Sequence, residues 1–159
     1  MSIRTCALTL TLALAIGLPA PAAAELTPVQ RTCQKRVGAQ GAAYLRKALK
    51  ALRQCHDRIS SGALAAGTDC TLEASTAMRI QNAAARFTTR VTGGCPDADV
   101  ASLVFGGPCY GSTTANDLVA CELDAHQDEA LALTATVYQT PPVLAGAART
   151  CQKTVARAC

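Results

Sequence analysis

The feature that most constrains the fold is an unbroken helical pattern from Val29 to Ile59. Apolar and small residues recur along it in steps of three or four, and a cysteine lies near each end. They are Cys33, Val37, Gly41, Leu45, Ala48, Leu52, Cys55 and Ile59. This spacing places them on one face of a helix with 3.6 residues per turn. We therefore expect one long amphipathic helix whose apolar face packs on a core. It should begin near Thr27-Pro28, with Thr27 as N-cap and Pro28 at the first helical position, and end near Ser60-Ser61-Gly62.

Residues 1–24 have the character of a secretory signal peptide. Arg4 provides a positive charge, residues 6–18 are apolar, and the small residues 22–24 suit cleavage. The apolar run is too short for a typical membrane span, which disfavours the alternative of an uncleaved anchor. We expect an exported protein, periplasmic or extracellular, in which residues 25–159 form a single cysteine-rich helical domain with no membrane span.

The number of cysteines is a second, independent indication of export. Loss of Cys6 with the signal would leave eight of the nine cysteines, and the net charge would be 14 − 11 = +3. An even number of cysteines in an exported chain predicts disulfides, here four. Aromatic residues make up only 3% of the chain, so the cross-links are expected to supply part of the stability, at about 2–4 kcal/mol each.

Three further long helical patterns and one short one follow. The second long helix is expected to begin near Thr71 and end at Gly93-Gly94. A short helix should begin at Cys95-Pro96-Asp97, with Pro96 at its first position. The apolar stripe of the second long helix is Ala77, Ile80, Ala84, Phe87 and Val91.

The third long helix opens at Thr114 with an approximate capping box, in which Asp117 takes the place of Glu or Gln. Its expected stripe is Val119, Leu123, His126, Ala130, Leu133 and Val137. A last helix begins at Pro141-Pro142. The predicted fold class is therefore all-α: a disulfide-stapled bundle of four main helices plus one short helix.

The end of the chain repeats its beginning. Residues 149–155 match residues 31–37 at six of seven positions, including the central cysteine. We interpret residues 149–159 as a partial second copy of the 31–37 motif, so that the domain is a single repeat-like unit whose C-terminal helix echoes the first.

Four segments together carry a resemblance to a known group of proteins. They are CQKxVxxxGxxYLxKxLKALxxC from Cys33, AGTDC ending at Cys70, CPDADVASLVFGG from Cys95, and the pair Ala125-His126. Their combination resembles a group of exported, alanine- and cysteine-rich bacterial proteins that occur as single or tandem units. The resemblance covers nearly all of residues 25–159 and implies a repeat unit, but it brings no catalytic residues.

Helix geometry limits how the cysteines pair. Cys33 and Cys55 lie 22 residues apart, roughly 33 Å along one helix, so they cannot bond to each other. If the first two helices form an antiparallel hairpin, Cys55–Cys70 and Cys33–Cys95 would join its two ends. Cys109, Cys121, Cys151 and Cys159 then pair among themselves, either as Cys109–Cys121 with Cys151–Cys159 or as Cys109–Cys151 with Cys121–Cys159.

The residues suggest little catalytic or metal chemistry. The chain has no C-x-x-C redox pair, no haem-attachment motif and no zinc-ligand spacing, and no serine stands in a G-x-S-x-G elbow. His126, near Asp124 and Asp128, is a candidate metal ligand or base, but residues two apart do not share a helix face, so we favour a packed boundary histidine. His56 and Asp57 point apart for a similar reason. We expect no catalytic residues, metal or cofactor, and an enzyme is the function with least support.

One surface of the first helix is basic. Its candidate anion-binding residues are Arg46, Lys47, Lys50 and Arg53, which could meet a polysaccharide, phospholipid headgroups or nucleic acid. The helix after Thr114 carries five acids and no lysine or arginine, so we expect pairing between the two helices to neutralise part of this face. A charge of +3 and few aromatics argue against nucleic acid.

The function predicted from sequence is a structural or binding role in a secreted or periplasmic, disulfide-stabilised helical module. Its partner would be an anionic surface or another protein. The alternative is a carrier of a small apolar ligand or lipid in an alanine-lined bundle.

Overall fold

A computed structural model describes residues 25–103, 105–138, 150–151 and 154–155. The elements in chain order are α1 (Pro28–Ser60), α2 (Ala74–Thr92), α3 (Asp97–Ser102), the short 3₁₀ helix η1 (Gly107–Cys109) and α4 (Ala115–Val137). The described residues contain no strand, so the all-α prediction is confirmed. Residues 150–151 and 154–155 are helical, and the rest of the helix expected from Pro141 lies outside the described residues.

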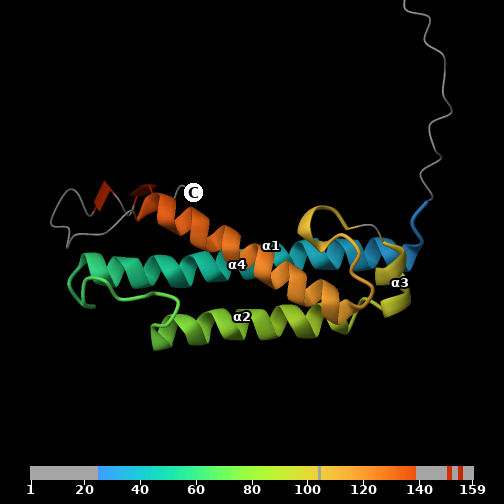
Figure 1. The fold of residues 1–159 in the computed structure, drawn as a ribbon, viewed down its shortest axis with the longest axis horizontal. Coiled ribbons are helices and arrows are strands. Elements are labelled where there is room, and N and C mark those ends of the chain that lie inside the picture. The colour runs from blue at the N-terminus through green and yellow to red at the C-terminus, as the bar shows by residue number, and fades with distance from the viewer. Residues whose placement is uncertain (1–24, 104, 139–149, 152–153, 156–159) are drawn as a thin grey trace, which may run out of the picture.

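The helices form a hairpin with a third helix laid across it. α1 and α2 run antiparallel and side by side, and α4 crosses them obliquely on one side (Figure 1). α3 and η1 join the hairpin to α4 near the amino-terminal end of α1. None of the helices in the described part of the chain combines the length and apolar character that a membrane crossing requires.

The first helix begins where the sequence predicts. Thr27 is the N-cap and Pro28 the first helical residue. The Thr27 hydroxyl accepts a hydrogen bond from the Gln30 amide at 3.2 Å, and the Gln30 side chain accepts one from the Thr27 amide at 2.8 Å. This reciprocal capping box satisfies two otherwise unpaired backbone donors, which explains the sharp start.

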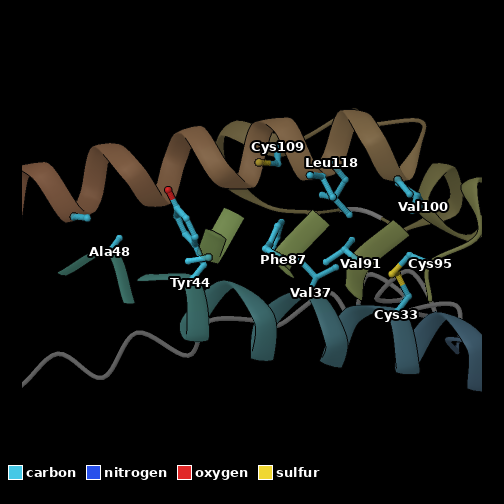
Figure 2. Packing of buried hydrophobic residues seen from close by; sticks show 14 of the residues in the cluster. Cys33, Val37, Tyr44, Ala48, Phe87, Val91, Cys95, Val100, Cys109 and Leu118 are labelled. Atoms are coloured by element: carbon cyan, nitrogen blue, oxygen red, sulfur yellow. A yellow bond between two sulfur atoms is a disulfide. The ribbon is translucent and has the colours of Figure 1, made fainter. Parts of the chain in front are cut away.

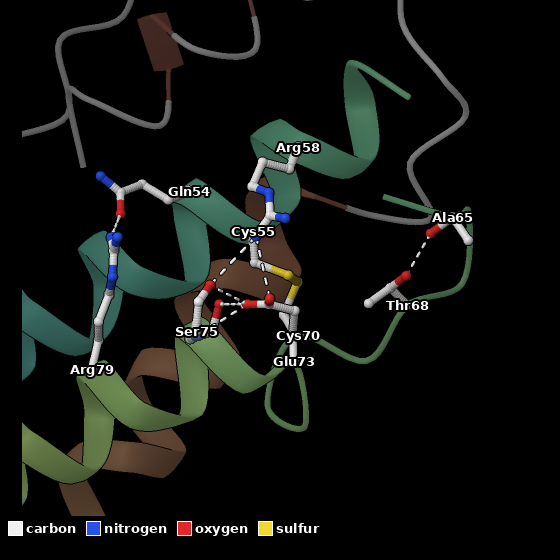
Figure 3. Close-up of polar contacts among 10 residues, drawn as sticks. Gln54, Cys55, Arg58, Ala65, Thr68, Cys70, Glu73, Ser75 and Arg79 are labelled. Atoms are coloured by element: carbon white, nitrogen blue, oxygen red, sulfur yellow. Dashed lines mark hydrogen bonds and ion pairs between the residues drawn. A yellow bond between two sulfur atoms is a disulfide. The ribbon is translucent and has the colours of Figure 1, made fainter. Parts of the chain in front are cut away.

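The second helix begins at Ala74, and the start predicted near Thr71 is wrong by three residues. The Asp69 carboxylate accepts hydrogen bonds from both the amide and the hydroxyl of Thr71, and this turn holds Thr71 out of the helix. Glu73 is the N-cap instead (Figure 3). Hydrogen bonds from Ser75 and Thr76 lower the pKa of the Glu73 carboxyl to about 2.

Two starts later in the chain differ from prediction in detail. α3 has Pro96 as its N-cap, and the Asp97 carboxylate accepts the Ala115 amide of α4 at 2.8 Å, which joins the two helix starts. Thr114 caps α4 by accepting the Asp117 amide. The other half of the predicted capping box is not formed, because the Asp117 carboxylate is too short and accepts the Thr113 hydroxyl instead.

Three disulfides are present in the described residues. Cys33–Cys95 and Cys55–Cys70 join the two ends of the hairpin, with Cα–Cα distances of 5.0 and 5.7 Å, as the helix geometry predicts. Cys109–Cys121 ties η1 to α4. This third bond excludes the alternative Cys109–Cys151 with Cys121–Cys159. Cys151 is exposed and bonds to no described cysteine, and Cys159 lies outside the described residues.

The core lies where the three long helices meet (Figure 2). Tyr44 of α1, which the predicted stripe omits, lies with its ring centroid 6.4 Å from those of Phe87 and His126. The α4 stripe is partly wrong, since Leu133 is 41% exposed while Leu118 and Thr134 are buried. On α2, the predicted Ala77, Ile80 and Ala84 are only half-buried, and Thr76 and Ala83 are buried. α2 contacts both α1 and α4, so its buried surface is broader than a single stripe.

A glycine on α1 makes room for the histidine of α4. Gly41 is buried, and a β-carbon there would overlap the His126 imidazole. Gly38, one turn earlier on the same helix, has open space at the equivalent position. Gly41 therefore sets how closely α4 approaches α1.

We expect Gly41→Ala and Gly38→Ala to have opposite effects on the free energy of unfolding. Gly38→Ala should raise it by about 0.5–1 kcal/mol, because alanine is the better helix former. Gly41→Ala should lower it by about 1 kcal/mol or more, because the imidazole loses its space. Urea unfolding measures the free energy of unfolding of both variants. It is also measured for Gly41→Ala in a His126→Ala background, which removes the overlap. Equal stabilisation by both glycine substitutions would contradict it.

Candidate functional site: a basic groove between α1 and α2

A groove follows the α1–α2 hairpin on the side away from α4. It consists of two adjoining hollows of about 280 and 800 Å³, which share Lys47, Asn82 and Arg86. The lining comes from α1, α2 and Gly93, with no residue of α4. These two hollows contain six cationic side chains and no carboxylate, whereas a third hollow that continues past Gln54 and Arg79 is lined by Asp57 as well as Arg58. We call the surface of the first two hollows the basic groove; its cations are Arg36, Lys47, Lys50, Arg79, Arg86 and Arg90.

Helical spacing explains why these residues meet. The α1 side of the groove is formed by Arg36, Gln40, Lys47, Lys50 and Gln54, and the α2 side includes Arg79, Asn82, Arg86 and Arg90. Intervals of three, four and seven residues keep each set on one helix face. The two disulfides fix the helices antiparallel, so the two polar faces lie beside each other along the groove.

The arginines toward the two ends of the groove are held by local contacts. Arg79 donates a hydrogen bond to the Gln54 side chain across the hairpin (Figure 3). The Arg36 guanidinium lies against Gly94 in the space that a side chain there would occupy. These contacts place two guanidinium groups on the groove without neutralising either.

The four remaining cations of the groove, Lys47, Lys50, Arg86 and Arg90, have no hydrogen-bond or ion-pair partner in the described residues. In that part of the chain the one ion pair between a lysine or arginine and a carboxylate joins Arg58 to Glu73, at 3.2 Å. The pairing expected between the basic face of α1 and the acids of α4 is therefore not formed. The groove faces away from α4, which leaves its charge exposed to solvent.

The anion-binding face predicted from sequence overlaps the groove in part. Lys47 and Lys50 line it, whereas Arg46 and Arg53 do not. The three arginines of α2 were missed, although a signal was present: Arg79, Arg86 and Arg90 lie seven and four residues apart on a helix with no acid.

His126 is a packing residue with two acidic neighbours. Its ring nitrogens lie 3.5 Å from Glu122 and 3.6 Å from Glu129, one turn before and after it, rather than beside Asp124 and Asp128. The residues described contain no group of three or more His, Cys, Asp or Glu side chains arranged to hold a metal ion. The His126 imidazole therefore packs against Gly41 in the contact between α1 and α4.

The other histidine belongs to a cluster at the far end of the bundle. The His56 and Tyr138 rings are stacked, with centroids 4.6 Å apart, and the Tyr138 hydroxyl donates to the Asp57 carboxylate at 3.4 Å. Tyr138 thus contacts both His56 and Asp57, although these neighbouring side chains point apart on α1. Burial, reinforced by Asp57, raises the pKa of Tyr138 to about 12. His56 Nδ1 is buried without a hydrogen-bond partner in the described residues, and burial lowers the pKa of His56.

A small cavity lies among the three long helices. Its volume is about 160 Å³, and its lining includes Ala48, Leu52, Ile80, Ala130 and Leu131. A cavity of about 150 Å³ holds one benzene ring, and ligand pockets usually measure about 300–1,000 Å³. This cavity therefore gives no support to the carrier hypothesis.

Comparison with known proteins gives no relative from which function could be inferred: no family model, curated protein sequence or solved structure matches the chain.

We expect His56 to make the protein less stable in mild acid. Its pKa in the folded state lies below 6.5, so the unfolded chain binds more protons in the window just below that pH. The free energy of unfolding should therefore fall as the pH decreases from about 7 through 6. His56→Phe, which keeps a ring to stack on Tyr138, should flatten this dependence.

Guanidinium unfolding at several pH values between 5.5 and 7.5 tests the effect. Carboxylates contribute alike to both proteins, so the difference between parent and His56→Phe isolates the histidine. Parallel curves for the two proteins would be inconsistent with a depressed His56 pKa.

Proposed function

We propose that this protein is an exported, disulfide-clamped helical module that binds an anionic ligand through the basic groove. One observation carries the proposal: six cationic side chains line a groove that has no carboxylate. Charged helix faces are ordinary, but they usually interleave acids with bases, as pairs three or four residues apart stabilise a helix. α1 and α2 together hold eleven lysines and arginines and a single acid, Asp57.

The energetics of folding do not account for this arrangement. Like charges one helical turn apart, at positions i and i+4, destabilise a helix by a few tenths of a kcal/mol per pair. The core packs on other faces of the same helices, and it would be unchanged by neutral residues in the groove. An anionic ligand would relieve the repulsion and accept hydrogen bonds from the four cations that have no partner among the described residues.

Export and the repeat-unit interpretation remain part of the proposal. Three disulfides in the described residues support an oxidising compartment, because such bonds are rare in reducing ones. The signal peptide expected in residues 1–24 and the echo of the 31–37 motif in residues 149–159 fall largely outside the described residues. A binding module that repeats would present several basic grooves in one chain.

The test compares two double variants with the same change in net charge. Lys47→Gln/Arg86→Gln removes two cations from the centre of the groove, and Lys35→Gln/Arg46→Gln removes two exposed cations of α1 outside it. Binding of inorganic polyphosphate is measured by isothermal titration calorimetry in 0.15 M NaCl. We expect the groove variant to lose at least about tenfold in affinity, because charge-assisted hydrogen bonds contribute about 1.5–3 kcal/mol each.

The control variant should lose less than about threefold, since surface charges at a distance are screened at this ionic strength. Equal losses in the two variants would mean that polyphosphate responds to net charge alone. That result would reject the groove as the binding site.

A further inference from the structure

We propose that the ligand of the basic groove is a linear acidic polysaccharide, a sugar chain that carries carboxylate or sulfate groups along its length. This inference rests on the proposed function and specifies the chemistry of the ligand. Three properties of the groove support it: its length, the polar residues between its cations, and the residue types that it lacks.

Length favours a polymer over a small anion. The groove extends along α1 from Arg36 to Gln54, a rise of about 27 Å at 1.5 Å per residue. Cations from α1 and α2 are distributed along this whole distance. A single phosphate or sulfate would contact only the cations at one level of the groove, whereas an extended chain could contact them in succession.

The residues between the cations favour a ligand with hydroxyl groups. Gln40 and Asn82 line the groove, and neither amide has a hydrogen-bond partner in the described residues. An amide offers two donors and an acceptor oxygen. A sugar hydroxyl can donate to that oxygen, but the oxygens of a fully ionised polyphosphate only accept. A polysaccharide can therefore pair with the cations and with both the N–H groups and the oxygens of these amides, whereas polyphosphate can pair with the cations and the amide N–H groups but leaves the amide oxygens without a donor.

The absent residue types disfavour two other polyanions. The groove lining contains no aromatic side chain, and single-stranded nucleic acids are usually bound by stacking bases on aromatic rings. A membrane of anionic lipid would meet exposed cations outside the groove, such as Arg46, as readily as those that line it. A thin sugar chain can lie between α1 and α2 and contact the cations of both.

The experiment compares acidic sugars with other probes on the full domain with its disulfides intact. The acidic sugars are oligogalacturonates of two to twelve units and a dextran sulfate oligosaccharide. The comparison probes are inorganic polyphosphate, oligothymidylate, neutral dextran and phosphatidylglycerol vesicles. We expect at least one acidic sugar to bind at least about fivefold more tightly than polyphosphate of equal charge. Its affinity should rise with chain length and level off when the chain spans the groove.

A pair of amide variants tests the role of the hydroxyl groups. Gln40→Leu/Asn82→Leu should weaken binding of the acidic sugar by about tenfold, from the loss of two hydrogen-bonding sites, and should weaken polyphosphate binding less, because polyphosphate can use only the amide N–H donors. Gln34→Leu/Asn116→Leu, which removes two exposed amides outside the groove, should change neither. The length series needs no variant, so it tests the inference even if an amide variant folds poorly.

The outcomes separate the two proposals. Equal or tighter binding of polyphosphate, oligothymidylate or vesicles, with loss in Lys47→Gln/Arg86→Gln, would overturn the polysaccharide and retain an anion-binding groove. Binding of neutral dextran as tight as that of the acidic sugars would overturn it as well. No binding of any anionic probe would overturn both proposals.

Discussion

The structure depends on the antiparallel pairing of α1 with α2, which a disulfide fixes at each end. Cys33–Cys95 and Cys55–Cys70 lie at opposite ends of the hairpin and prevent the two helices from sliding or splaying. This constraint matters in a chain with few aromatic residues, where helix packing alone provides less apolar contact than usual. It also creates the basic groove, because cations from two helices line one groove only when the helices keep their register.

α4 completes the core from one side and leaves the other side of the hairpin open. It packs through Leu118, Val119 and Ala130, and Gly41 lets His126 approach α1 closely. All five acids of α4 are thereby kept away from the groove. The lining of the basic groove therefore holds six cations and no carboxylate from α4, and this uncompensated charge is the strongest indication of function.

The fold was predictable wherever a local signal was strong. Thr27 and Pro28 predicted the start of α1, and the length of that helix was enough to pair Cys33 and Cys55 with different cysteines. Predictions failed where a tertiary or loop contact decided the outcome: Asp69 delays α2, and the oblique crossing of α4 buries Leu118 and Thr134 instead of Leu133. Only the α1 side of the groove was predictable from sequence. The expected hairpin does not specify which face of α2 lies beside Lys47 and Lys50, so the arginines of α2 could not be assigned to the same surface.

The most direct test of this account is to map the anion site by residue with NMR. Side-chain Nε–H resonances of arginine would be followed in isotope-labelled protein during titration with inorganic polyphosphate. If the basic groove is the anion site, Arg36, Arg79, Arg86 and Arg90 will shift together and saturate with one dissociation constant, while Arg31 and Arg46 will shift little. Shifts that are as large at Arg31 and Arg46 as at the groove arginines would contradict it.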